Sequence, residues 1–197
     1  DISEDCKRFY FEKTLKRAKM FLGEKEDKVE NINGESVPTV KDLISKIDVS
    51  YLSSGISASF HGDFILDNIL ENEKGFTLLD WRQDFAGRID IGDIYYDLAK
   101  LNHNLIFNHE IVNSGKYTIS YDDGKVTCDI LCSKNLIDCQ EVLHQFIEDN
   151  GYDLGKVKIL TAIIWINMSG LHEHPLNSFL FNFGKYNLYK AVQKNDI

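Results

Sequence analysis

The chain has 197 residues, 43% of them hydrophobic, and its formal net charge at pH 7 is -9. This length suits one compact domain with a sizeable core, residues 1–197, and is short for two ordinary domains. The negative charge argues against a general binder of nucleic acid or of anionic membranes, because a surface of phosphates would repel the chain.

The sequence contains no run of about 18 or more apolar residues, so it predicts no membrane-spanning helix. Residues 1–21 are charged throughout and lack the apolar segment of a signal peptide. The first residue is Asp1 rather than Met, which indicates a processed or truncated product. The cysteines form neither a Cys-x-x-Cys pair nor a dense disulfide framework, which favours reduced thiols and a cytoplasmic location. They are Cys6, Cys128, Cys132 and Cys139.

The first third of the chain predicts two helices joined by a polar segment. Apolar residues at helical spacing predict an amphipathic helix over residues 4–22, with Gly23 as its C-terminal stop. Residues 23–38 are polar and turn-rich, which predicts a connection. Thr39, followed by Asp42 three positions later, predicts the capped start of a short helix that ends near residue 47.

The rest of the chain predicts two hairpins among helices. A short extended segment at 58–60 precedes strands at 69–71 and 76–79, which are joined by a turn. A second hairpin, peripheral and spanning about residues 116–131, turns at Asp122-Asp123-Gly124. Helical spacing predicts further helices over 93–108, 135–149, 154–171 and 176–193. The predicted fold class is mainly α with a small β element, an α+β fold.

One segment has the residue types that phosphoryl transfer requires. His61-Gly62-Asp63 is followed by Asn68 and then by an apolar strand that ends in Asp80. A carboxylate beside the attacking hydroxyl can orient it and accept its proton, while an Asn oxygen and a second carboxylate can hold Mg²⁺. Mg²⁺ is a hard cation that prefers such oxygen ligands. The segment is therefore a candidate phosphoryl-transfer site.

The predicted hairpin explains how these polar residues could meet. The loop at 61–68 and the strand end at residue 80 flank the hairpin, so Asp63, Asn68 and Asp80 can reach one mouth. We expect the hairpin to pack on the helical body, which would hold the three groups rigidly. The apolar side chains expected to make that contact are Ile69, Leu70, Leu78 and Leu79.

The segment resembles the catalytic core of the aminoglycoside phosphotransferase and choline kinase superfamily, distant relatives of protein kinases. The resemblance implies the C-terminal, catalytic lobe of a protein-kinase-like fold, with Asp63 as catalytic base and His61 in the same site as a support of the loop. It also implies that Asn68 and Asp80 hold Mg²⁺ and thereby ATP, the phosphoryl donor. The expected activity is an ATP-dependent phosphotransferase acting on a small-molecule acceptor.

A second signature extends this resemblance. The run from Gly92-Asp93 to Asp97-Leu98-Ala99 resembles the family's Gly-Asp and Asp-Leu-Ala pattern. By this likeness Asp97 would accept hydrogen bonds from backbone amides of the catalytic loop, and Asp93 would be a structural neighbour. Arg82 is expected either to touch a phosphate of the nucleotide or to pair with Asp84. Asp84 itself is expected to be a solvated loop acid.

The resemblance is closest to a bacterial subgroup of these phosphotransferases found with capsule and surface-glycan genes, in which some members are fused to a sugar nucleotidyltransferase. It rests on residues 9–15, 80–85, 93–101 and 150–153. Kinases of this type cover the phosphates with a Gly-rich loop from a second, β-sheet lobe. Residues 1–60 contain no Gly-x-Gly, so we expect the N-terminal lobe to be missing from this chain and present in a parent protein.

Three other interpretations remain open at the level of sequence. The chain could be a non-catalytic, kinase-derived binding module, the lobe of a bifunctional nucleotidyltransferase-kinase, or a metal-dependent hydrolase. Retention of Asp63, Asn68 and Asp80 together argues against a pure scaffold, and a hydrolase would normally need more His or carboxylate ligands near the motif. The acceptor is open among a sugar, an amino alcohol, an aminoglycoside and an amide-bearing metabolite, each suited to an acidic cleft.

Overall fold

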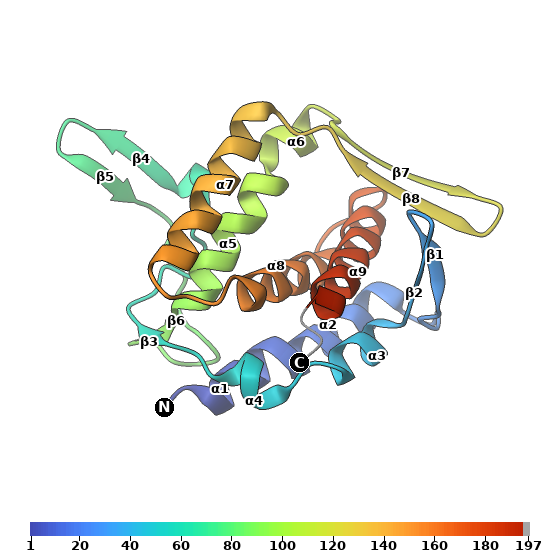
Figure 1. Cartoon of the computed structure of the whole chain (residues 1–197), viewed down its shortest axis with the longest axis horizontal. Helices are drawn as coiled ribbons and strands as arrows, with labels where there is room; N and C mark the ends of the chain where they lie inside the picture. Colours follow the sequence, from blue (N-terminus) through green and yellow to red (C-terminus); the bar gives the residue numbers. More distant parts are fainter. Residues whose placement is uncertain (195–197) are drawn as a thin grey trace.

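The computed structural model describes residues 1–194, and the chain is a mixed α/β structure, 53% helical and 16% strand (Figure 1). The predicted α+β class, mainly α, is confirmed at this level. The helical segments are α1 (Ser3–Lys7), η1 (Arg8–Glu12), α2 (Lys13–Leu22), α3 (Val40–Ser45), α4 (Val49–Ser53), η2 (Leu66–Asn68), α5 (Ile94–Ile106), α6 (His109–Asn113), α7 (Lys134–Asp149), α8 (Leu154–Ser169) and α9 (Leu176–Lys194). The strands are β1 (Glu30–Ile32), β2 (Glu35–Val37), β3 (Ser57–Ala58), β4 (Ile69–Asn72), β5 (Gly75–Leu78), β6 (Gly92–Asp93), β7 (Tyr117–Asp122) and β8 (Lys125–Ile130).

The first helix is continuous through α1, η1 and α2, as predicted for residues 4–22. It ends at Gly23, which has a φ of 60° and donates its amide to the oxygen of Lys19 at 2.9 Å. The middle part, η1, is a π-helical turn whose three aromatic residues are all buried: Phe9, Tyr10 and Phe11.

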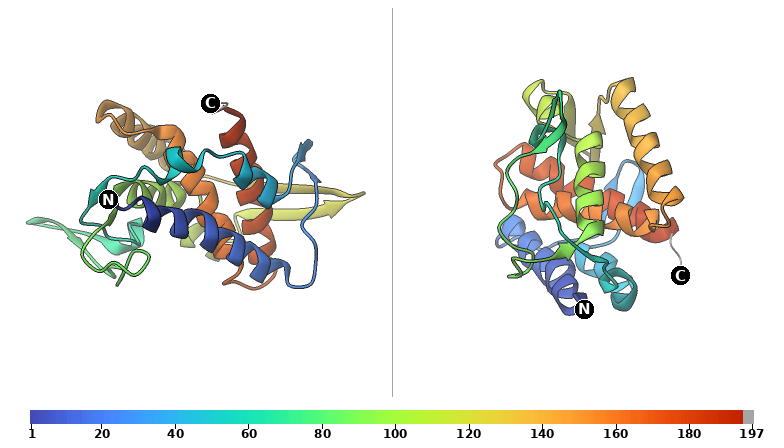
Figure 2. Two further views of the ribbon diagram at one scale, coloured as in Figure 1. Left: turned by 90° about the horizontal axis from the view of Figure 1, so that it is seen from below. Right: turned by 90° about the vertical axis from the view of Figure 1, so that its left-hand side faces the viewer.

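The helix α8 forms the centre of the body and is buried around most of its circumference (Figures 1 and 2). It packs against α2, α5, α7 and α9. The closest approach is to α9, where a Cβ on Gly184 would lie 2.8 Å from Cγ1 of Ile166. The absence of a side chain at Gly184 therefore lets the two helix backbones come together. Among residues 1–194 no helix combines the length and the apolar character needed to cross a bilayer.

The hairpin predicted at about 116–131 is present as β7 and β8, but it is not an isolated peripheral ribbon. It belongs to a four-stranded sheet with the order β2-β1-β8-β7, in which β1 runs parallel to β8. The prediction of a simple polar connection over residues 23–38 was therefore wrong. Asn33 and Gly34 have φ values of 51° and 84° and form the tight turn between β1 and β2. These strands have only three residues each, too few for alternation to be visible in sequence.

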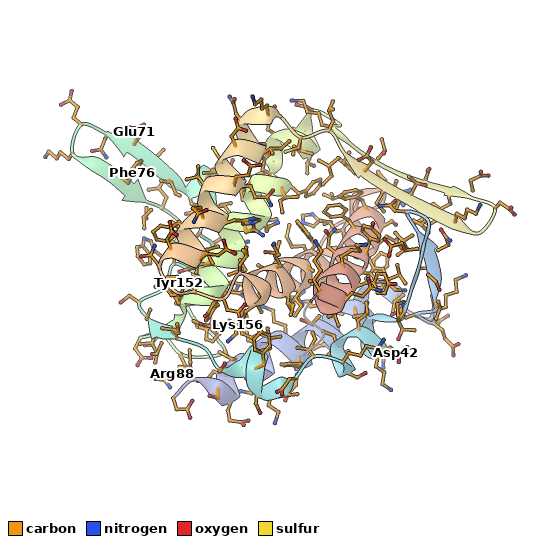
Figure 3. All side chains as sticks on the ribbon, viewed as in Figure 1. Asp42, Glu71, Phe76, Arg88, Tyr152 and Lys156 are labelled. Atoms are coloured by element: carbon orange, nitrogen blue, oxygen red, sulfur yellow. The ribbon has the colours of Figure 1, made fainter. Side chains whose placement is uncertain are left out.

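The predicted hairpin beside the motif is also present, as β4 and β5, but its expected packing on the helical body was wrong. The hairpin extends away from the body, and the labelled Glu71 and Phe76 lie on its outer part (Figure 3). Leu70 and Leu79 are exposed, whereas Ile69 and Leu78 are half-buried. Only the base of the hairpin is therefore fixed by the rest of the chain.

Two short helices, α4 and α6, were not predicted. Asp48 caps α4 by accepting a hydrogen bond from the amide of Tyr51 at 3.0 Å, and Asn108 caps α6 by accepting one from Ile111 at 3.1 Å. Each helix has five residues, which is too short for a helical period. The break between α5 and α6 also ends the helix predicted over 93–108 at residue 106.

Candidate functional site

The candidate site is built on two segments that are joined by backbone hydrogen bonds. The amide of Leu79 donates to the oxygen of Asn68 at 2.9 Å, and the amide of Arg82 donates to the oxygen of His61 at 2.8 Å. These bonds hold the segment 79–82 along the loop 61–68. Asp80 lies between the two anchored residues, so it is fixed beside the loop that carries Asp63 and Asn68.

The carboxylate of Asp63 is held through both of its oxygens. The ammonium of Lys100 lies 2.7 Å from Oδ1, and Nδ2 of Asn68 donates to Oδ2 at 3.2 Å. Nδ2 of Asn68 also donates to the main-chain oxygen of Asp63 at 2.9 Å. The Asp63 side chain is nevertheless 42% exposed, against 12% for Lys100. It is therefore both oriented and open to a ligand.

One face of α5 fixes the loop at three points. Asp97 accepts the amides of His61 and Gly62, each at 2.7 Å, which are the hydrogen bonds expected of it. Lys100 contacts Asp63, and Oδ1 of Asn104 accepts the amide of Leu66 at 2.9 Å. Burial raises the pKa of Asp97 above its usual value, against the lowering effect of the two amide hydrogen bonds.

Sequence reasoning missed Lys100 and Asn104. Their signal is the spacing of Asp97, Lys100 and Asn104, which are three and four positions apart and so share a face of a helix. A stripe of three polar residues on a largely buried helix marks the side that meets a polar partner. Here that partner is the loop 61–68, through its backbone amides for Asp97 and Asn104 and through the carboxylate of Asp63 for Lys100.

His61 is a structural part of the loop and does not reach the surface. His61 is 3% exposed, and the centre of its ring lies 4.8 Å from the centre of the Trp81 ring. Nδ1 accepts the amide of Asp63 at 3.2 Å, so the ring orients the backbone of the proposed base. Its placement agrees with support of the loop and leaves no direct contact with a substrate.

Two residues of the site have left-handed backbone conformations. Gly62 has a φ of 79°, and a Cβ at this position would lie 2.4 Å from Cβ of Arg82. Only glycine fits both the conformation and the close approach. Asp80 has a φ of 51°, which is uncommon for a residue with a side chain and occurs often at functional sites.

The oxygens of Asn68 and Asp80 are chemically suited to a hard cation. Nδ2 of Asn68 is engaged by Asp63, which leaves Oδ1 as the atom for coordination. No residue of the described chain donates a hydrogen bond to the carboxylate of Asp80. Over residues 1–194 there is no cluster of three or more His, Cys, Asp or Glu able to hold a metal ion. A metal ion at this site would therefore depend on Asn68, on Asp80 and on ligands from outside the protein, such as water or phosphate.

Asp93 is a buried anchor beneath the site. Its carboxylate accepts the hydroxyl of Tyr10 at 2.7 Å and the amides of Ile56 and Tyr95 at 2.9 and 3.2 Å. These contacts tie the first helix, the short β3–β6 pairing and the start of α5 to one residue. Asp93 is therefore a buried link between these three elements.

Arg82 does not form the alternative pair with Asp84. Its guanidinium lies over the ring of Phe9 at 5.2 Å and donates to the hydroxyl of Tyr96 at 3.4 Å. Asp84 instead accepts the amide of Gly87 at 2.7 Å, so its carboxylate closes a turn. Arg82 is therefore available to a ligand.

A pocket of about 320 Å³ begins at Arg82. It lies between the first helix and the loop that follows Asp80, and its cationic residues Arg8, Lys13 and Arg82 outnumber its single carboxylate, Asp84. The expectation of an acidic cleft does not describe this pocket. Sequence reasoning missed Arg8 and Lys13 because a charged helix face is normally a solvated one.

Comparison of the chain with protein-family models, with curated proteins and with solved structures found no match.

Proposed function

We propose that the chain is the catalytic lobe of an ATP-dependent phosphotransferase that acts on a hydroxyl of a small molecule, similar to aminoglycoside phosphotransferases and choline kinases. The observation that carries this proposal is the pair of backbone hydrogen bonds from Leu79 and Arg82 to the loop 61–68. They bring a held but accessible carboxylate, an amide oxygen and a second carboxylate onto adjoining segments. A scaffold has no need of that combination.

Asp63 is the proposed catalytic base. Each carboxylate oxygen has more than one acceptor site, so Asp63 can accept a hydroxyl while it keeps its contacts with Lys100 and Asn68. These two contacts fix the direction from which the acceptor hydroxyl is bound. Proton removal by a positioned side chain typically contributes about 10² to 10⁴ in rate.

Asn68 and Asp80 are the residues proposed to hold Mg²⁺. Bound Mg²⁺ would neutralise charge on the phosphates of ATP. The role of this chain is to keep the two oxygen ligands in place. Asn68 is held by its hydrogen bonds to Asp63, and Asp80 is held by the anchored residues Leu79 and Arg82 on either side of it.

The proposal includes a second lobe that covers the nucleotide and contacts the β4–β5 hairpin. Its support is a set of exposed apolar side chains next to the site. Leu70 is 50% exposed, Phe76 73% and Trp81 54%. Leu70 and Phe76 pair with Thr77 and Glu71 and so lie on opposite faces of the hairpin, which means that a covering lobe would have to contact both faces. Fusion to a nucleotidyltransferase, as in some members of the similar subgroup, is compatible with such a lobe.

A non-catalytic binding module is the alternative favoured by one observation. The ion pair between Asp63 and Lys100 already satisfies the charge of the proposed base. If the pair served only to stabilise the loop, Asp63 would have no role in turnover.

Paired substitutions in the full-length gene product test the proposal. Asp63→Asn is expected to lower turnover by about 10² to 10⁴ while ATP·Mg affinity stays nearly unchanged, since the base meets only the acceptor. Asp80→Asn is expected to lower both turnover and ATP·Mg affinity, because the phosphates lose their counter-charge.

The matched control is Asp67→Asn, which removes the same charge from the same loop. Oδ2 of Asp67 lies 3.4 Å from Nδ1 of His109 at the surface. Because Asp67 has no proposed role in the reaction, turnover is expected to change by less than about twofold. Nucleotide affinity, turnover with a panel of hydroxylated acceptors, and circular dichroism are measured for all three variants. Full activity of Asp63→Asn on acceptors that the unchanged protein phosphorylates would exclude this assignment of the site.

A further inference from the structure

The pocket between the first helix and the loop 82–87 has the size of a small-ligand site. Its volume of about 320 Å³ is at the lower end of the range found for ligand pockets, roughly 300 to 1,000 Å³. One wall is the face of η1 and α2 that carries Arg8, Phe9 and Lys13, and the other is the loop from Arg82 to Gly87. The proposed catalytic roles do not use this pocket.

Lys13 is a half-buried cation without an anionic partner. No carboxylate of the described residues lies within ion-pair distance of its ammonium, which sits 3.7 Å from the centre of the Phe9 ring. Burial, together with the nearby charges of Arg82, Arg17 and Lys100, lowers the pKa of Lys13 to about 7, against the attraction of Asp84. A cation in such a place is unfavourable unless an anion joins it.

The other charges of the pocket leave it cationic. Arg82 rests on Phe9 and Tyr96 and has no ion pair among the described residues. Arg8 pairs with Asp5 at the outer edge. The single carboxylate in the wall, Asp84, accepts a backbone amide of its own turn. Lys13 and Arg82 are therefore the two cations available to a ligand.

The pocket is adjacent to the proposed site of transfer. Arg82 follows Asp80 by two residues, and its amide is bonded to His61 at the start of the loop that carries Asp63. A ligand in the pocket would thus lie near the residue proposed to receive the acceptor hydroxyl.

We propose that this pocket binds an anionic group of the acceptor, a phosphate or a carboxylate, through Lys13 and Arg82. The inference rests on the proposed phosphotransferase function and narrows its acceptor class to anionic molecules such as sugar phosphates or sugar acids. Cationic acceptors, including aminoglycosides and amino alcohols, are disfavoured because the pocket would repel them. The anion binds unchanged, and its role is to place the hydroxyl that reacts.

The first test measures binding to the chain of residues 1–197 without any reaction. Glucose, glucose 6-phosphate, glucuronate and inorganic phosphate are titrated while the NMR signals of the amides of residues 82–87 are followed. The three anions are expected to shift these signals with at least about tenfold higher affinity than neutral glucose, since charge-assisted hydrogen bonds supply the difference. Equal affinity for glucose and glucose 6-phosphate, or no binding of any anion, would overturn the inference.

Matched variants locate the binding. Lys13→Gln is expected to weaken glucose 6-phosphate binding about tenfold, whereas Lys13→Arg keeps the charge and retains binding. Lys19→Gln removes the same charge from an exposed position on the same helix and is expected to change affinity by less than about twofold. An equal loss in Lys13→Gln and Lys19→Gln would mean that general charge, and not the pocket, attracts the anion.

Two further measurements separate this inference from the proposed function. Asp63→Asn is expected to retain anion binding within about twofold even though turnover falls, so failure of either proposal is visible by itself. ATP·Mg is expected not to displace glucose 6-phosphate from residues 82–87. Competitive displacement would assign the pocket to the phosphates of the donor and overturn its assignment to the acceptor.

Discussion

The two long hairpins of the chain have opposite relations to the helical body. The β7–β8 hairpin is joined by β1 and packs on α9, and its residues Val126 and Cys128 are buried. The β4–β5 hairpin pairs only with itself and extends into solvent, with Phe76 at its outer part (Figure 3). The first hairpin was expected to be fixed on the body, which is wrong. The second was expected to be peripheral, and it lies at the edge of the molecule but within a larger sheet (Figure 1).

The difference shows what alternation of residues can predict. A strand of alternating side chains has two faces, and its sequence indicates that one face is apolar without indicating what covers it. Leu70 and Phe76 have the same apolar character as Val126, yet they are 50% and 73% exposed. We therefore expect the β7–β8 hairpin to contribute more to stability than the β4–β5 hairpin.

The largest effect on stability is expected at Ile32, the fully buried residue of β1 that joins the sheet to the body. Ile32→Ala is expected to lower the free energy of unfolding by about 2–5 kcal/mol, because the side chain leaves a cavity. Urea denaturation measures this change. The control is Val29→Ala, one residue before the strand and exposed, with an expected cost below about 0.5 kcal/mol. Similar costs for the two substitutions would mean that the small strands do not belong to the core.

An effect on stability of similar size, with a larger one on function, is expected at Gly62. Gly62→Ala puts a methyl group into contact with Arg82 and pushes apart the two segments of the candidate site. Gly124→Ala is the matched control, since Gly124 in the β7–β8 turn also has a positive φ but no atom within 4 Å of a Cβ.

Both alanines carry the strain of a left-handed backbone, about 1–2 kcal/mol, and Gly62→Ala is expected to cost about 1–3 kcal/mol more because of its contact. Denaturation and turnover are measured together. Only Gly62→Ala is expected to lower turnover. Equal turnover in the two variants would show that the spacing between loop 61–68 and Arg82 does not matter to activity.

Sequence patterns of a few neighbouring residues correctly predicted where some helices begin or end. Gly23 ends the first helix, and Thr39 caps α3 by accepting the amide of Asp42 at 3.0 Å. The β1–β2 turn also has a local signal, Asn33-Gly34, but the strands around it are too short to support it. Its parallel partner β8 lies about 90 residues away in sequence, and no local pattern reports such a pairing.

The candidate site was predictable in its polar residues and not in their partners. The spacing of Asp63, Asn68 and Asp80 placed them on adjoining segments, because a short hairpin returns the chain to its starting point. The contact of Lys100 with Asp63 depends on how α5 is rotated against the loop. The cationic pocket depends on how the first helix packs against residues 82–87. Both are tertiary arrangements, which no local pattern of the sequence reports.

The smallest effect on stability is expected at Phe76, and it tests the comparison of the hairpins most directly. In residues 1–197 alone, Phe76→Ser is expected to change the free energy of unfolding by less than about 0.5 kcal/mol, because the 73% exposed ring has little contact to lose. In the full-length gene product the same substitution is expected to weaken ATP·Mg binding, because a lobe that covers the nucleotide would use this ring as a contact. Urea denaturation of the chain and nucleotide titration of the full-length product are the two measurements. A loss above about 1 kcal/mol in the chain alone would mean that the hairpin packs on the helical body after all. Unchanged ATP·Mg affinity in the full-length product would remove the exposed hairpin from the support for a second lobe, while the polar site at its base would still depend on Asp63 and Asp80.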